Sequence, residues 1–187
     1  MKIKCSFDEA EMRMKKLAKK LESEGKIVQT FPVGGSCPES MWAYVDCWAE
    51  MESQYEFFDQ ITDVVAVYGT GGTVLDLALG NYWSGMKKRV HGVSILSRSE
   101  FKESDFFTDA KKCLEETGIK DVPIKEIVDI IEGYVGECYA DTWPELRQFS
   151  LAVARKTGII LDTTYTCKAV YGESNDLGIG FTADIQL

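Results

Sequence analysis

A glycine-rich loop between two apolar segments constrains this sequence most. Residues 61–67 are a β-branched run typical of a buried strand, residues 74–79 begin a helical pattern, and Gly69-Thr-Gly-Gly-Thr73 lies between them. An ordinary turn needs one glycine at most. A loop with three can expose several N–H groups near the positive end of a helix dipole, which favours an anion such as phosphate. The alternative is a tight turn that only packs closely.

Two familiar phosphate-binding motifs do not fit this loop. No lysine follows it, so it is not a P-loop, and it lacks the third glycine of a dinucleotide-binding fingerprint. In an open parallel sheet, ligands bind at the carboxyl ends of the strands, where this loop would lie. The spacing therefore predicts a phosphate cradle of another kind.

The rest of the chain alternates between helical and strand patterns. Helices are expected at 8–24, 40–58, 73–82, 101–118 and 143–157, and strands at 26–33, 62–67, 89–96 and 158–162, with 123–131 left open between a short helix and a strand. Such alternation predicts an α/β fold with three layers, in which an open, mostly parallel sheet carries helices on both faces.

Composition excludes several classes of function. The 187 residues include 30 acidic and 21 basic side chains, and the net charge of −9 argues against a nucleic-acid surface. No apolar run reaches the roughly 18 residues of a membrane span, and the charged N-terminal stretch does not look like a signal peptide. We expect a cytoplasmic protein that binds neither nucleic acid nor membrane.

The cysteines and the histidine do not suggest a metal site. The six cysteines are scattered without a C-x-x-C pair, and His91 is the only histidine. Zinc ligands normally come in closely spaced pairs. We expect no metal, and reduced thiols that pack as small apolar groups.

Five short motifs follow one another along the chain. They are Pro32-Val-Gly-Gly-Ser36, Tyr68-Gly-Thr-Gly-Gly-Thr73, Val90-His-Gly-Val-Ser94, Gly133-Tyr-Val-Gly136 followed by Tyr139, and Gly158-Ile-Ile-Leu-Asp162 followed by Tyr165-Thr-Cys-Lys-Ala169. In this order and spacing the chain resembles the D-cysteine desulfhydrase and 1-aminocyclopropane-1-carboxylate (ACC) deaminase family, from about residue 8 to residue 172. Each motif alone is weak, but five in register are fairly specific.

The resemblance implies a fold and a domain plan. Members are enzymes of fold type II, with a tryptophan synthase β-like fold, and use pyridoxal 5'-phosphate (PLP). Residues 1–187 would form a single, truncated α/β domain. Within it, residues 1–33 resemble the end of the family's small domain, residues 34–172 its cofactor-domain core, and residues 173–187 have no assignment.

The resemblance also implies roles for individual residues. Tyr139 and Tyr165 resemble active-site tyrosines close to the substrate and the cofactor ring. Deaminases carry a glutamate after the second tyrosine to pair with the pyridine nitrogen, whereas this chain has Thr166, as desulfhydrase-like members do. A hydroxyl deepens the electron sink less than a carboxylate, which favours β-elimination over ring opening. The cofactor phosphate would be held by Gly69, Thr70, Gly71, Gly72 and Thr73.

Two family segments have no counterpart in this sequence. One carries the lysine to which the cofactor is attached, and the other is a C-terminal H-T-G-G segment. Lys168 belongs to the Y-T-x-K motif, whose lysine in the family does not attach the cofactor. The remaining lysines are expected mostly on solvated helix faces, as in the pairs Lys15-Lys16, Lys19-Lys20, Lys87-Lys88 and Lys111-Lys112.

Three hypotheses follow. The first is a desulfhydrase-like enzyme that converts a small amino acid to pyruvate, ammonia and sulfide by α,β-elimination, inactive as this isolated chain, with an ACC deaminase-like activity as a further alternative. The second is a truncated pseudoenzyme that keeps a phosphate pocket. The third is an α/β domain with an interaction role. A truncated domain would expose sheet edges, so we expect a homo-oligomer or a complementing chain.

Overall fold

A parallel sheet of three strands forms the centre of the computed structural model, which describes residues 7–37, 39–86, 88–97, 110–112, 114–119 and 122–176. The strands are β1 (Asp63–Tyr68), β2 (Arg89–Ser94) and β3 (Val128–Ile131), in the order β1-β2-β3. Both pairings are parallel. The carboxyl ends of all three strands therefore lie at one edge of the sheet.

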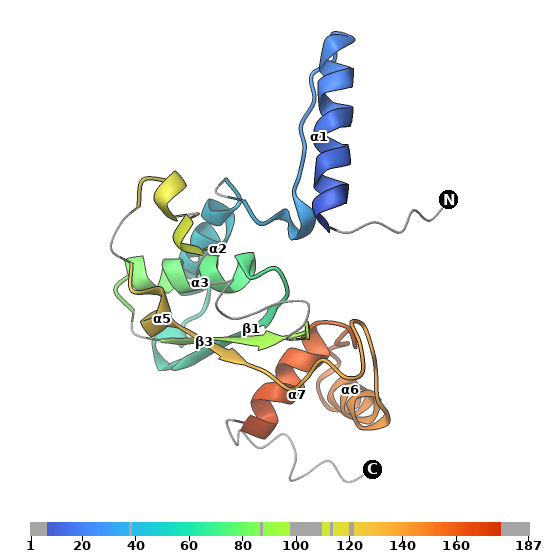
Figure 1. Cartoon of the computed structure of the whole chain (residues 1–187). Coiled ribbons are helices and arrows are strands. Elements are labelled where there is room, and N and C mark those ends of the chain that lie inside the picture. Colours follow the sequence, from blue (N-terminus) through green and yellow to red (C-terminus); the bar gives the residue numbers. More distant parts are fainter. Residues whose placement is uncertain are drawn as a thin grey trace.

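Helices cover both faces of the sheet (Figure 1). Neighbouring residues of β2 define the faces, because successive side chains of a strand point in opposite directions. A Cβ at Gly92 would meet Val74 of α3, whereas Val93 touches Gly172 of α7. The predicted three-layer α/β architecture is confirmed. The helical elements are α1 (Phe7–Ser23), η1 (Val33–Gly35), α2 (Met41–Gln54), η2 (Phe58–Gln60), α3 (Gly72–Trp83), α5 (Ile124–Ile127), α6 (Pro144–Thr157) and α7 (Thr166–Asp176).

Helix α1 stands away from the sheet, and an extended segment runs back beside it (Figure 1). A strand was expected at 26–33, but Val33 begins η1, and residues 26–32 form no ladder with the rest of the described chain. The prediction is wrong because a β-strand needs a hydrogen-bonded neighbour. The side chains of Ile27 and Phe31 are exposed as a result.

The prediction of a strand at 158–162 is also wrong. Gly158 takes a left-handed conformation (φ 76°) and ends α6, and Asp162 bonds to the first N–H groups of α7. The segment is therefore a short connection between two helices. Ile159 and Ile160 lie on its exposed side, and Leu161 packs against the cluster of α6 and α7.

Helix α7 was not expected, and it continues through Asp176, past the limit at Gly172 assigned to the core. The glycine at 172 weakens the helical pattern. It is needed there, because a Cβ would lie 2.9 Å from the Tyr134 ring and 3.0 Å from Val93. The predicted helix at 101–118 lies largely outside the described residues. Within that range, residues 110–112 and 114–116 are described and helical. Of the expected 173–187 tail, residues 177–187 lie outside them too.

A charged cluster joins the three strands on the α7 side of the sheet. The ring nitrogens of His91 lie 2.8 Å from Asp63 Oδ1 and 3.1 Å from Asp129 Oδ2. Hydrogen bonds from the Thr62 hydroxyl, His91 and Arg89 outweigh burial and lower the pKa of Asp63 to about 2. Because its members come from β1, β2 and β3, this cluster helps to hold the strands in register.

Within the described ranges, no helix is both long and apolar enough to cross a membrane. The same residues contain no group of three or more side chains suited to hold a metal ion.

Candidate functional site

The glycine loop joins the end of β1 to the start of α3. Gly71 is the N-cap residue of α3, and its φ of 92° is a left-handed conformation that favours glycine. The first backbone hydrogen bond of the helix runs from Leu75 N to Gly71 O. The N–H groups of Gly72, Thr73 and Val74 therefore have no partner within the helix, as is usual in a first turn. They lie at the sheet edge where ligands of such folds bind.

A second loop packs against the first. Ser36 Oγ lies 2.6 Å from Thr70 Oγ1, within hydrogen-bond distance. A Cβ at Gly34 would lie 2.5 Å from Thr70 Oγ1, and a Cβ at Gly72 would lie 2.5 Å from Ser36 Oγ. Both glycines are thus required for the two loops to approach. Ser36 was not among the predicted site residues. The signal in the sequence was its place after two glycines, at the end of the Pro32–Ser36 motif.

The two predicted active-site tyrosines meet in the structure. Tyr139 follows β3 and Tyr165 precedes α7, and their hydroxyl groups form a hydrogen bond. The rings are 6.4 Å apart at an interplanar angle of 64°, and both side chains are partly exposed. The hydrogen bond to Tyr165, with a smaller contribution from burial, raises the pKa of Tyr139. The fold thus brings together two phenolic hydroxyl groups that lie 26 residues apart in the sequence.

Thr166 forms the start of α7 together with Asp162. Its hydroxyl donates to Asp162 Oδ2 at 2.5 Å, and its backbone N–H donates to the same oxygen at 3.0 Å. Burial would raise the pKa of Asp162, but these bonds and those from the N–H groups of Tyr165 and Thr164 lower it. The hydroxyl of Thr166 is thus engaged in capping the helix. Its role beside a cofactor ring stays a prediction.

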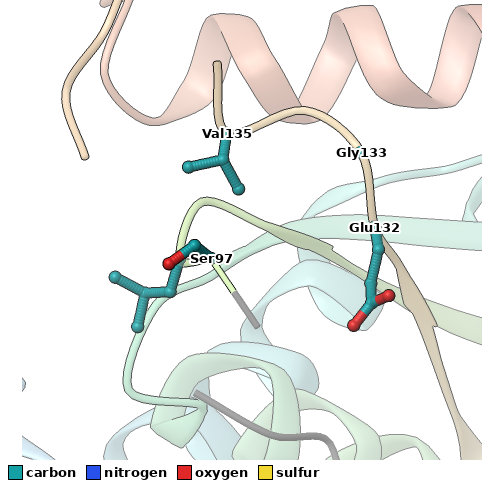
Figure 2. A pocket seen from close by; sticks show the side chains of 5 residues that line it. Ser97, Glu132, Gly133 and Val135 are labelled. Atoms are coloured by element: carbon teal, nitrogen blue, oxygen red, sulfur yellow. The ribbon is translucent and has the colours of Figure 1, made fainter. Parts of the chain in front are cut away.

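A pocket of about 410 Å³ opens beyond the ends of β2 and β3 (Figure 2). Because β1 and β3 flank β2, their ends are separated by two strand spacings, about 10 Å. The pocket thus lies at the same sheet edge as the glycine loop. Its walls are Leu96, Ser97, Glu132, Gly133 and Val135.

Comparisons with known proteins agree with this arrangement. No family model matches the chain. A bifunctional D-cysteine desulfhydrase/ACC deaminase of Arabidopsis thaliana, named as mitochondrial, is 34% identical over 164 residues, which cover 86% of this chain and 39% of the plant protein. A crystal structure of an ACC deaminase homologue matches with a TM-score of 0.78 at 28% identity, covering 94% of this chain and 52% of that one. The chain belongs to the D-cysteine desulfhydrase and ACC deaminase family.

The match is to part of the family's length. A Pyrococcus horikoshii protein, provisionally named as an ACC deaminase, is 32% identical over 157 residues, which cover 83% of this chain and 46% of that protein. The chain thus spans about half the length of the curated family members that it matches.

Three buried charged groups were not predicted. Lys88 was expected in solvent but is buried, because its Nζ donates to the carbonyls of Phe58 and Ile61 at 2.6 and 2.7 Å. Lys168 is fully buried as well. Asp76, in the second turn of α3, is 4% exposed, and burial raises its pKa to about 7. The signal in the sequence for this burial was an acidic residue within a mostly apolar helix.

Proposed function

We propose that this chain provides the phosphate-binding half of a PLP-dependent enzyme of the desulfhydrase type. Such an enzyme removes thiol and ammonia from a small amino acid by α,β-elimination, leaving pyruvate, ammonia and sulfide. One observation carries the proposal. The glycine loop presents N–H groups of the first turn of α3, which have no partner within the helix, at the carboxyl edge of a parallel sheet, in a chain of the PLP-using family.

The residues of the loop fit a phosphate group. The N–H groups of Gly72 and Thr73 can donate to its oxygens, and the hydroxyl of Thr73 can add a donor. The glycines at 69, 71 and 72 leave room for a close approach. PLP, when bound, supplies the electron-accepting ring on which the chemistry of this family depends.

The tyrosine pair can orient the substrate and hold a proton at the same edge. A phenol is protonated at neutral pH, so the Tyr139 hydroxyl can donate to a carboxylate or a leaving group when Tyr165 is the donor in their mutual hydrogen bond. Tyr165 supports that hydroxyl through their mutual hydrogen bond. Thr166 adds no negative charge next to Tyr165, which agrees with elimination rather than ring opening.

The family lysine is not supplied by the two buried lysines of the described chain. Lys168 Nζ donates to Val135 O at 2.6 Å and is fully buried, and Lys88 Nζ is held by two carbonyls. A chain without the family lysine would hold the phosphate group without turning over substrate, as the pseudoenzyme hypothesis also states. We propose that activity requires the family segment that carries this lysine, and that this chain assembles with a further copy of itself or with a complementing polypeptide. Exposed apolar side chains on α1 and on segment 26–32 support this assembly; they include Leu17, Ile27 and Phe31.

Ring opening of ACC is the second candidate for the assembled enzyme. The names of the Arabidopsis and Pyrococcus relatives favour it, because both include ACC deaminase. The absence of a carboxylate after Tyr165 favours elimination. A cytoplasmic location is likewise a proposal, since the name of the plant relative places that protein in mitochondria.

Binding of PLP by the purified chain tests the proposal. PLP should bind measurably more tightly than pyridoxal, which lacks the phosphate, and inorganic phosphate should compete. Gly71→Val should weaken PLP binding by roughly tenfold or more, because a β-branched residue at φ 92° is strained and shifts the loop. Absorbance titration gives the affinities for PLP and pyridoxal and, by competition, for inorganic phosphate. Borohydride reduction with mass spectrometry reports any covalent lysine adduct.

Gly25→Val is the matched control. Gly25 also has a positive φ, of 78°, with no atom within 4 Å of the place where a Cβ would lie, and it follows the end of α1, away from the loop. This variant should bind PLP as the unmodified chain does. Equal affinity for PLP and pyridoxal, or unchanged PLP affinity in a folded Gly71→Val variant, would show that the loop is not a phosphate cradle.

A further inference from the structure

Lys168 joins helix α7 to the loop that carries Tyr139. The side chain is fully buried in the first turn of α7, and its Nζ donates to Val135 O at 2.6 Å, 33 residues earlier in the sequence. The ammonium group also lies 5.6 Å from the centre of the Trp143 ring. Desolvation lowers its pKa, while the nearby Asp141 carboxylate opposes that shift. A buried lysine is retained at such a place only with good partners.

The loop that Lys168 holds has an unusual backbone. Between β3 and α6, Gly133, Gly136 and Ala140 all have positive φ values, of 105°, 86° and 65°. Ala140 lacks the conformational freedom of glycine, so the surrounding contacts must hold this conformation. Asp141 closes the loop by accepting from the Glu137 N–H at 2.9 Å. That bond is internal to the loop and does not fix its position on the protein.

The position of this loop decides two features of the proposed site. Val135, whose carbonyl accepts the bond from Lys168, also lines the pocket beyond β2 and β3 (Figure 2). Four residues later, Tyr139 meets Tyr165, which precedes α7. Lys168 lies three residues after Tyr165, and its N–H donates to Tyr165 O at 3.0 Å. One residue thus bonds both to the loop that carries Tyr139 and to Tyr165.

We propose that Lys168 is a positioning residue, which fixes the 133–142 loop against α7 and thereby sets the pocket wall and the Tyr139–Tyr165 hydrogen bond. The assignment of a catalytic purpose to that geometry rests on the proposed function. The geometric claim itself can be measured without cofactor or substrate. Its failure and the failure of PLP binding are therefore distinguishable.

Titration of the tyrosines tests this claim. The ultraviolet difference spectrum of the folded protein is followed with pH, and Tyr139→Phe identifies the contribution of Tyr139. In Lys168→Met, Tyr139 should titrate at a lower pH, near the ordinary value of about 10, because its bond to Tyr165 is lost. Loss of a nearby positive charge alone would move the titration in the opposite direction. The sign therefore separates lost positioning from lost charge.

Three further variants complete the test. Tyr165→Phe gives the titration of an unpaired Tyr139, which Lys168→Met should match. Lys168→Arg, which keeps a charged donor, should restore the titration of the unmodified protein. Lys156→Met, on the exposed end of α6, should leave it unchanged. A folded Lys168→Met protein that titrates as the unmodified protein would overturn the proposal.

Hydrogen exchange of the unmodified protein covers the case in which Lys168→Met does not fold. The N–H groups of Glu137 and Asp141 in the loop should exchange about as slowly as those of Lys168 and Ala169 in α7, because both belong to one unit. Loop exchange at least roughly a hundredfold faster than that of α7 would show that the loop moves independently, and the proposal would fail.

Discussion

Replacing Asp76 with asparagine is expected to stabilise the protein at pH 8 by about 4 kcal/mol and to leave its stability near pH 4 almost unchanged. The pKa of this carboxyl rises from 3.8 to about 7 on folding, because burial disfavours the charged form. A shift of about three pKa units corresponds to about 4 kcal/mol. For a chain of this length, the midpoint of thermal unfolding should rise on the order of 10 °C at pH 8.

The sign of this effect follows from proton binding. A carboxyl with a raised pKa holds its proton more tightly in the folded state than in the unfolded state. Stability therefore falls as the pH rises from about 4 to about 7, and the full penalty is present above pH 7. Asparagine is neutral throughout, so the difference between the two proteins should grow over this range.

The burial of Asp76 comes from close packing on one side of α3. Gly72 and Gly80 lie four residues before and after it, on the same helix face. A Cβ at Gly72 would lie 2.5 Å from Ser36 Oγ, and one at Gly80 would lie 2.6 Å from Trp48 Cβ. The helix face that carries Asp76 is thus pressed against α2 and the Ser36 loop.

Urea unfolding at several pH values between 4 and 8 measures the effect. Asp46→Asn is the matched control, since Asp46 is exposed on α2 and should change stability by less than about 0.5 kcal/mol at every pH. A difference between Asp76→Asn and the unmodified protein that does not depend on pH would contradict the assigned titration.

Replacing Lys88 with methionine is expected to destabilise the protein by about 3 kcal/mol. The ammonium group donates to the carbonyls of Phe58 and Ile61 and lies 4.6 Å from the centre of the Phe58 ring. Methionine keeps most of the apolar volume but leaves both carbonyls without their donor. Buried groups that lose a charged partner cost about 1–3 kcal/mol each. The loss should appear in the free energy of unfolding in urea.

The comparison with Lys156→Met isolates the role of burial. Both variants remove one positive charge, but Lys156 is exposed in the last turn of α6. The control should change the free energy of unfolding by no more than about 0.5 kcal/mol. If the two variants were equally stable, the carbonyls of Phe58 and Ile61 would have to be satisfied by water, and Lys88 would have no structural role.

Local features of the sequence predicted the elements around the glycine loop well. The β-branched run before it became β1, and the apolar pattern after it became α3, each with ends within one or two residues of the prediction. Steric rules act between neighbours in the chain, so a run of β-branched residues followed by several glycines has few alternatives. The five motifs likewise identified the family without any knowledge of the fold.

The two wrongly predicted strands failed for different reasons. Segment 26–32 is extended as expected but is not a strand, because no other strand lies beside it among the described residues. The apolar run at 158–162 is a connection between helices, because Gly158 ends α6 and Asp162 starts α7. The first result cannot be read from the segment itself, whereas the second follows from Gly158 and Asp162 within it.

The sequence by itself determined that a glycine-rich turn joins a strand to a helix, since only backbone sterics and periodicity are involved. The tertiary structure decided what this turn and its surroundings can do. It brought Ser36 to Thr70 and Tyr139 to Tyr165, and it buried Asp76, Lys88 and Lys168. The physical reason is that hydrogen bonding and desolvation depend on groups brought together by packing, whatever their separation along the chain.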